Sequence, residues 1–247
     1  MKNTFDKVVS VGCSFSKDLN KIEAAQTAFR TGFIPTEIED MKFLYPQLVA
    51  DKLNAECINL SVSGIDNEYI IHTTLDYAQN NDNKNILYLI QFTYMWRLGF
   101  PVRTSKLGWL SLRPTGETTG DSYFSDKVVN KFYDTYIKYF YHEDICLKIL
   151  LQKIDLLKTW FEFHNISYKF LTTAQSIEPI YTFRSHHLEN VDEKKFIEFC
   201  SNNNFLELTK DLFYIDKWAI LKELNTTKDI HLTKKGHKVL SNLILDE

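Results

Sequence analysis

The chain has 247 residues and a formal net charge of -3, and 44% of its residues are hydrophobic and 25% are charged. This composition is ordinary for a globular protein with a core of normal size, and its length suits one large α/β domain or two small ones. The slightly acidic balance gives no indication of the basic surface of a nucleic-acid-binding protein.

The cysteine and histidine pattern argues against a metal site. Four cysteines lie far apart and show no metal-ligand spacing: Cys13, Cys57, Cys146 and Cys200. His186 and His187 have no carboxylate or cysteine at ligand spacing. The N-terminus lacks a signal pattern, and no run approaches the ~20 apolar residues of a membrane span. We therefore expect a cytoplasmic protein with no metal, no cofactor, no nucleic-acid partner and no membrane partner.

The first half of the chain alternates strands and helices. An apolar strand over 7–12 delivers Ser14 to its carboxyl end, and a polar connection over 17–40 is long enough to be a lid or the wall of a site. The patterns that follow predict a helix over 43–53, a strand over 57–60, a turn over 61–67, a helix ending near 79 and a strand over 86–90. A β-α-β-α-β order favours a doubly wound parallel sheet.

The second half begins with an aromatic-rich insertion over about 94–144, which we expect to pack over the edge of the sheet. We interpret its aromatic residues as the insertion's own core, and the alternative is that some of them line an acyl or sugar pocket. Further patterns predict a helix over 145–163, strands over 168–172 and 205–208, helices near 196–200 and over 211–224, and a terminal helix capped by Thr233. No linker or repeat is visible, so one domain over 1–247 is the economical prediction.

Reactive residue types lie in three predicted turns at the edge of the sheet. Ser14 follows the first strand, Gly64 lies in the turn after the second strand, and Asp229 and His231 precede the terminal helix. A serine needs an imidazole to take its proton, and the imidazole needs a partner, commonly a carboxylate, to hold its tautomer. A glycine in a strand-to-helix turn can offer its backbone N–H to an oxyanion. Together, these residues point to nucleophilic acyl chemistry.

Four stretches resemble sequence blocks of the SGNH, or GDSL-type, hydrolase family. Residues 8–16 resemble the first block, although Cys13 replaces its usual Asp, and residues 44–50 resemble the helix after the first loop. Residues 59–64 resemble the second block and residues 229–237 the last. The resemblance covers both ends and the first third of the chain.

The resemblance implies a three-layer α/β/α flavodoxin-like sandwich with a parallel sheet, and a Ser-His-Asp site. In this scheme Ser14 is the nucleophile, His231 the base and Asp229 the residue that orients the base. The backbone N–H groups of Ser14 and Gly64 hold the oxyanion. The expected substrate is a small-molecule or carbohydrate acyl ester.

Two positions depart from the family pattern. The third block normally supplies an Asn as an oxyanion donor, but this strand ends in Gln91-Phe92-Thr93, so Thr93 or Gln91 occupies that neighbourhood and Asn67 is another candidate. The usual Asp lies three residues before the His, where this chain has Lys228. Asp229 remains our choice, with Asp216 in reserve.

Simpler interpretations stand beside the catalytic one. Ser14 and Asn67 could only cap helices, and Cys13 could be a nucleophile, although a small buried side chain is the preferred interpretation. We interpret His237 as structural or exposed. Three arginines of the insertion are either solvated, which we prefer, or hold an anionic substrate: Arg97, Arg103 and Arg113.

The function hypotheses are therefore a serine esterase, an acyltransferase with the same site, and a non-catalytic binding module on the same fold. A flavin-binding flavodoxin is a weaker fourth, because the stretch after the first strand lacks glycine. The oligomeric state is left open.

Overall fold

The computed structural model describes residues 4–13, 44–62, 64–93, 97–102, 108–112, 118–119, 126–173, 193–210, 212–224 and 232–246. The fold and the site are described for these residues.

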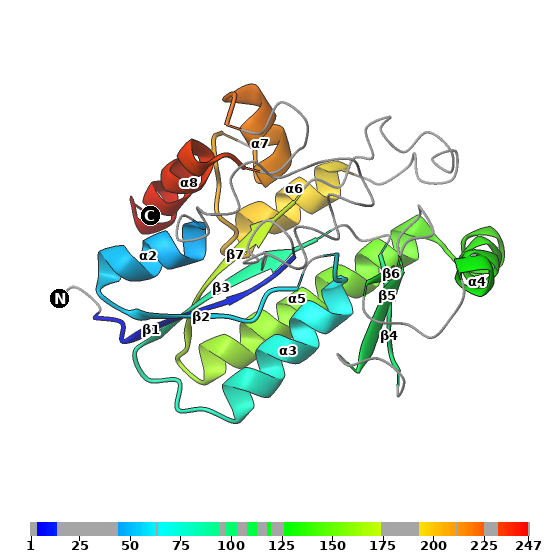
Figure 1. The fold of residues 1–247 in the computed structure, drawn as a ribbon, viewed down its shortest axis with the longest axis horizontal. Coiled ribbons are helices and arrows are strands. Elements are labelled where there is room, and N and C mark those ends of the chain that lie inside the picture. Colours follow the sequence, from blue (N-terminus) through cyan, green and yellow to red (C-terminus); the bar gives the residue numbers. More distant parts are fainter. Residues whose placement is uncertain are drawn as a thin grey trace.

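A four-stranded parallel sheet forms the centre of the protein (Figure 1). Its order is β2 (Glu56–Asn59), β1 (Lys7–Val11), β3 (Ile86–Phe92) and β7 (Ser167–Thr172). Every residue of β3 is buried, which explains the unbroken apolar run over 86–90, because a central parallel strand is covered on both faces. Beyond β7, Phe205 forms a single parallel bridge to Phe170, so the strand predicted over 205–208 is reduced to this contact.

Helices cover both faces of this sheet and confirm the predicted three-layer α/β/α sandwich (Figure 1). One layer holds α2 (Tyr45–Leu53) and α8 (Lys234–Asp246), and the other holds α3 (Asn67–Gln79) and α5 (Glu143–Phe163). The chain also forms α6 (Glu193–Asn202) and α7 (Ile215–Leu221). None of the helices in the described ranges is long and apolar enough to cross a membrane.

The two helices of the first layer are joined by polar contacts. The backbone N–H of Tyr45 donates to His237 Nδ1 at 3.3 Å, and Lys52 Nζ donates to Ser241 Oγ at 2.9 Å. His237 is buried, so the prediction of a structural role for it is confirmed, and the alternative of an exposed histidine is wrong.

Thr233 caps α8, as the sequence predicts. Its hydroxyl oxygen accepts from the Gly236 N–H at 3.2 Å, and its own N–H and hydroxyl donate to the Leu224 carbonyl at 2.7 and 2.8 Å. These bonds fix the start of α8 against the end of the segment that follows α7.

The insertion contains a second, antiparallel sheet in the order β4 (Leu98–Pro101), β5 (Trp109–Leu112) and β6 (Thr118–Thr119), followed by α4 (Asp126–Tyr139). Figure 1 shows this sheet on the side toward which the parallel strands point. The side chains of Tyr139 and Phe140 are 66% and 73% exposed. The interpretation of the insertion's aromatics as its own core is therefore wrong for these two residues.

Candidate active site

The site begins where β1 and β2 end. The Leu60 N–H donates to the Ser10 carbonyl at 2.8 Å, and the Val62 N–H donates to the Gly12 carbonyl at 2.9 Å. The chain that leaves β2 therefore stays beside the chain that leaves β1 as far as Gly12. Ligands bind at this carboxyl edge in open α/β sheets.

Gly64 lies in a tight turn immediately after this paired segment. The Ile65 N–H donates to the Val62 carbonyl at 3.4 Å, so Gly64 is the third residue of a four-residue turn. Its φ of 76° is the value that the third residue of a type II turn requires, and only glycine adopts it without strain. The glycine of the second block is thus needed for the shape of the turn.

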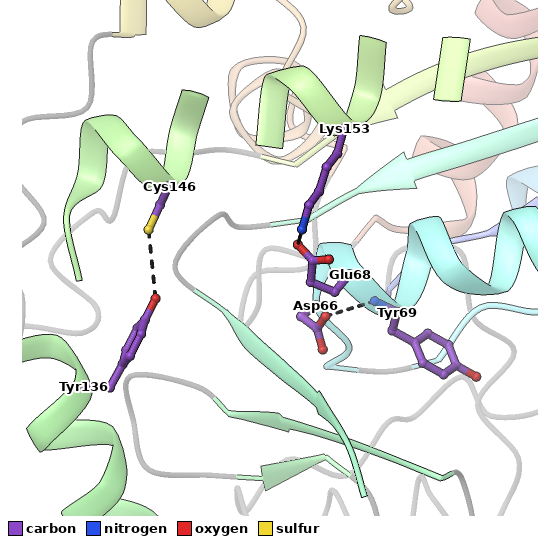
Figure 2. A network of polar contacts seen from close by, with 6 residues as sticks. All are labelled: Asp66, Glu68, Tyr69, Tyr136, Cys146 and Lys153. Carbon is purple, nitrogen blue, oxygen red and sulfur yellow. Dashed lines mark hydrogen bonds and ion pairs between the residues drawn. The ribbon is translucent and has the colours of Figure 1, made fainter. Parts of the chain in front are cut away.

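Asp66 starts α3. It is the N-cap residue, and its Oδ1 accepts from the Tyr69 N–H at 3.0 Å (Figure 2). The simpler interpretation that Asn67 caps this helix is therefore wrong, because Asn67 is its first helical residue. Beside the cap, Lys153 of α5 forms an ion pair with Glu68 at 2.5 Å, which ties the same turn to α5 (Figure 2).

Asn67 joins the start of α3 to the end of β3. Its Nδ2 donates to the Thr93 carbonyl at 2.9 Å, and its Oδ1 accepts from the Thr93 N–H at 2.8 Å. Both residues are almost fully buried, with exposed fractions of 6% and 1%. The Thr93 hydroxyl is buried and has no hydrogen-bond partner among the described residues. The structure therefore brings together two of the predicted oxyanion residues, at the carboxyl end of β3.

The alternative candidate at the end of β3, Gln91, points elsewhere. It is fully buried, and its Nε2 donates to the Sγ of Cys13 at 3.1 Å. Cys13 is also fully buried, as the preferred interpretation predicts, which removes it from contact with solvent. A thiol in this position is not an exposed nucleophile.

Asp66 is also the contact point of the insertion. Its Oδ2 accepts from the Trp109 Nε1–H at 2.9 Å, and Arg97 Nη1 donates to the neighbouring Ile65 carbonyl at 2.8 Å. Arg97 is half-buried, so the interpretation of this arginine as solvated is wrong. Burial raises the pKa of Asp66, and the hydrogen bonds from the Tyr69 N–H and from Trp109 oppose that rise.

Several predicted site residues lie outside the described part of the chain. These are Ser14, Ser63, Asp229, His231, Arg103, Arg113, His186 and His187, together with the connection over 17–40. Asp216, the reserve carboxylate, is buried in the first turn of α7. The roles predicted for Ser14, Asp229 and His231 therefore stay predictions.

Sequence reasoning missed two residues of this region, Asp66 and Trp109. The capping role of Asp66 could have been predicted from the sequence, because an Asp directly before a helical pattern is a common N-cap. The contact between Asp66 and Trp109 could not have been predicted, since 43 residues separate them and no periodicity relates them.

Comparison with known proteins completes this picture. No family model matches the chain, and the search of curated proteins finds no significant relative. The chain is similar to a member of the lipolytic protein G-D-S-L family from Veillonella parvula, with 10% identity, a TM-score of 0.47 and coverage of 97% of this chain and 96% of that one. It is similar to the psychrotrophic esterase EstA from Pseudoalteromonas sp. (12% identity, TM-score 0.43, 98% of this chain and 95% of that one). It is also similar to the acetylxylan esterase Axe2 from Geobacillus stearothermophilus (12%, 0.43, 100% and 95%).

These solved structures include a protein of the family that the sequence blocks resemble. At such low identities and TM-scores they carry no argument about chemistry, which has to come from this chain's own residues.

Proposed function

We propose that this protein is a serine hydrolase of the SGNH type that cleaves a small acyl ester. The observation that carries the proposal is the hydrogen bond from the Val62 N–H to the Gly12 carbonyl. Ser14 is the second residue after Gly12, and Gly64 is the second residue after Val62. The pairing of the two chain segments ends two residues before each of these positions, which supports a nucleophile at Ser14 and an oxyanion donor at Gly64. A nucleophile and its oxyanion donor need to lie close together.

The chemistry follows from residue types. Ser14 Oγ attacks the acyl carbon while His231 takes the hydroxyl proton, and Asp229 holds the imidazole in the required tautomer. His231 then returns the proton to the departing alcohol, and water releases the acyl group from Ser14 in a second cycle.

The oxyanion donors are proposed to be the N–H groups of Ser14 and Gly64, with Asn67 in place of the missing third-block Asn. An amide nitrogen carries two hydrogens, and Asn67 Nδ2 uses one on the Thr93 carbonyl. The second hydrogen is the one that we assign to the acyl oxygen. The buried hydroxyl of Thr93 is the alternative third donor.

Hydrolysis of p-nitrophenyl acetate tests this function. The wild type should turn over this ester, and Ser14→Ala should abolish turnover, because only the nucleophile is removed. Ser201→Ala, an exposed serine on α6, is the matched control and should keep the wild-type rate. Equal activity in wild type and Ser14→Ala would overturn the proposal.

The substrate is proposed to be a small acyl ester, in particular an O-acetyl group on a carbohydrate, in line with the resemblance to esterases. Acetate release from an acetylated xylo-oligosaccharide, compared with hydrolysis of p-nitrophenyl octanoate, separates a small from a long acyl group. Faster reaction with the octanoate would contradict a small acyl pocket.

A binding module on the same fold is the second candidate, because Thr93 stands where the family pattern expects an Asn. An acyltransferase would use the same site but pass the acyl group to a second alcohol. Product analysis with an added sugar acceptor separates transfer from hydrolysis, and the absence of both from a folded protein favours the binding module.

A further inference from the structure

The turn after Gly64 is held by three separate segments. Asn67 binds the end of β3 through the Thr93 peptide, Arg97 immediately before β4 donates to the Ile65 carbonyl, and Trp109 of β5 donates to Asp66. Two of these three segments belong to the insertion. The insertion is therefore bonded directly to Ile65 and Asp66, the last residue of the turn over 62–65 and the residue after it. We call the turn over 62–65 the oxyanion turn.

The Asp66 carboxylate is fully buried, and each of its oxygens has a donor. Oδ1 accepts from the Tyr69 N–H, and Oδ2 accepts from the Trp109 indole (Figure 2 shows the first of these bonds). With both oxygens engaged in this way, the carboxylate is suited to fix geometry and not to exchange protons with a substrate.

Gly99 of β4 lies against the same carboxylate. A Cβ at this position would overlap the Asp66 carboxyl group, so only glycine permits β4 to approach this closely. The Trp109 ring also packs on α3, with its centroid 5.7 Å from Tyr69 and 5.8 Å from His72. Asp66 is thus enclosed between the first turn of α3 and the inserted sheet.

A buried charge of this kind is costly for folding. Burial disfavours the ionised form, and a neutral side chain of the same size avoids that penalty. A helix cap alone does not require it, because Asn caps a helix about as well as Asp. The carboxylate differs from Asn in one respect that matters here, since it accepts from two donors on two separate elements.

We propose that Asp66 and Trp109 form a clamp by which the inserted sheet holds the oxyanion turn in its working conformation, so that both are positioning residues. The inference rests on the proposed function, because the turn is an oxyanion turn only if Ser14 is a nucleophile. It assigns the insertion a part in arranging the site, besides any part in binding substrate.

Two conservative variants test the clamp. Trp109→Phe keeps an aromatic ring on α3 but removes the indole donor. Asp66→Asn keeps the cap to Tyr69 but turns an amide N–H₂ toward the indole N–H. Each should lower kcat for p-nitrophenyl acetate between about 10- and 10²-fold with little change in KM, because displacing a catalytic donor by a fraction of its hydrogen-bond length weakens transition-state binding. The matched controls are Trp160→Phe on α5 and the exposed Asp155→Asn, which should keep the wild-type kcat.

The double variant Asp66→Asn/Trp109→Phe measures whether Asp66 and Trp109 act together. If the two residues act as one clamp, its kcat should fall no further than that of either single variant, because the contact is already lost. Additive losses would overturn the clamp as a unit.

Hydrogen exchange separates failure of the clamp from failure of the proposed function. In both single variants the amides of residues 64–69 should exchange faster than in the wild type at a temperature where the protein stays folded. An inactive wild type with faster exchange in the variants would refute the hydrolase and retain the clamp. Unchanged exchange and unchanged kcat in both variants would overturn the clamp, whatever the activity of the wild type.

Discussion

At the scale of single residues, Asn67 combines a structural contact with a proposed catalytic role. Its amide pairs with both polar groups of the Thr93 peptide in a buried setting. The sequence predicted Asn67 and Thr93 as separate candidates for the third oxyanion donor. Their mutual contact could not be predicted, because it joins the start of a helix to the end of a strand. The cap was assigned to the wrong residue, since the pattern Asp66-Asn67 offers two capping side chains and only backbone conformation decides between them.

Replacement of this amide should affect both stability and catalysis. Asn67→Ala leaves the buried N–H and carbonyl of Thr93 without their partner, so the free energy of unfolding should fall by about 1–3 kcal/mol. If Asn67 is the third donor, kcat should also fall by about 10²–10³. Asn81→Ala, an exposed asparagine that follows the same helix, is the control for urea unfolding and ester turnover. Full activity in Asn67→Ala would contradict the donor role.

Thr93→Val distinguishes the two candidate donors. Valine has the shape of threonine without the hydroxyl, and this hydroxyl has no partner among the described residues, so stability should hold or rise. With Asn67 as the third donor, kcat should stay within a few-fold of wild type. A loss of about 10²-fold in the same turnover assay would assign the donor role to the Thr93 hydroxyl instead.

At the scale of elements, the long regular segments were predictable and the insertion was not. The apolar run over 86–90 of β3 and the Thr233 cap of α8 both follow from local patterns. The inserted sheet has strands of only four, four and two residues, too short for an alternation to stand out. Its place against α3 depends on Asp66 and Trp109, which are distant in sequence.

The close packing of Gly236 in α8 against Leu224 leads to a prediction at the scale of elements. A Cβ on Gly236 would lie 2.5 Å from the Leu224 carbonyl oxygen. A carbon and an oxygen atom clash at this distance. Gly236→Ala should therefore destabilise the protein by about 1–3 kcal/mol, although alanine favours helix. Urea unfolding against the exposed control Lys235→Ala measures this, and a gain in stability for Gly236→Ala would show that α8 shifts without cost.

At the scale of the whole molecule, the order of the elements outside the insertion was largely predictable, because most of them have a hydrophobic period of their own. The parallel sheet and the two helical layers confirm the predicted fold class. The single domain over 1–247 stays a prediction, and so do Ser14, Asp229 and His231, which lie outside the described residues.

Global stability should depend on pH through Asp66. Burial raises its pKa in the folded state above the ordinary value of 3.8, so the folded protein binds more protons than the unfolded chain between these two values. The contribution of Asp66 to stability must therefore fall as pH rises through this window. The free energy of unfolding of Asp66→Asn minus that of wild type should increase from about pH 4 upward and then level off. A difference that is constant, or that decreases, in urea titrations at several pH values would contradict the raised pKa.

Ser14 is proposed to be an activated nucleophile, and covalent labelling with a serine-reactive probe measures this activation. Wild-type protein treated with a fluorophosphonate should gain the mass of one adduct, mapped to the peptide that contains Ser14, and Ser14→Ala should gain none. Ser201→Ala should label as the wild type does. An unlabelled, folded wild type, or an adduct that persists in Ser14→Ala, would show that Ser14 is not an activated nucleophile.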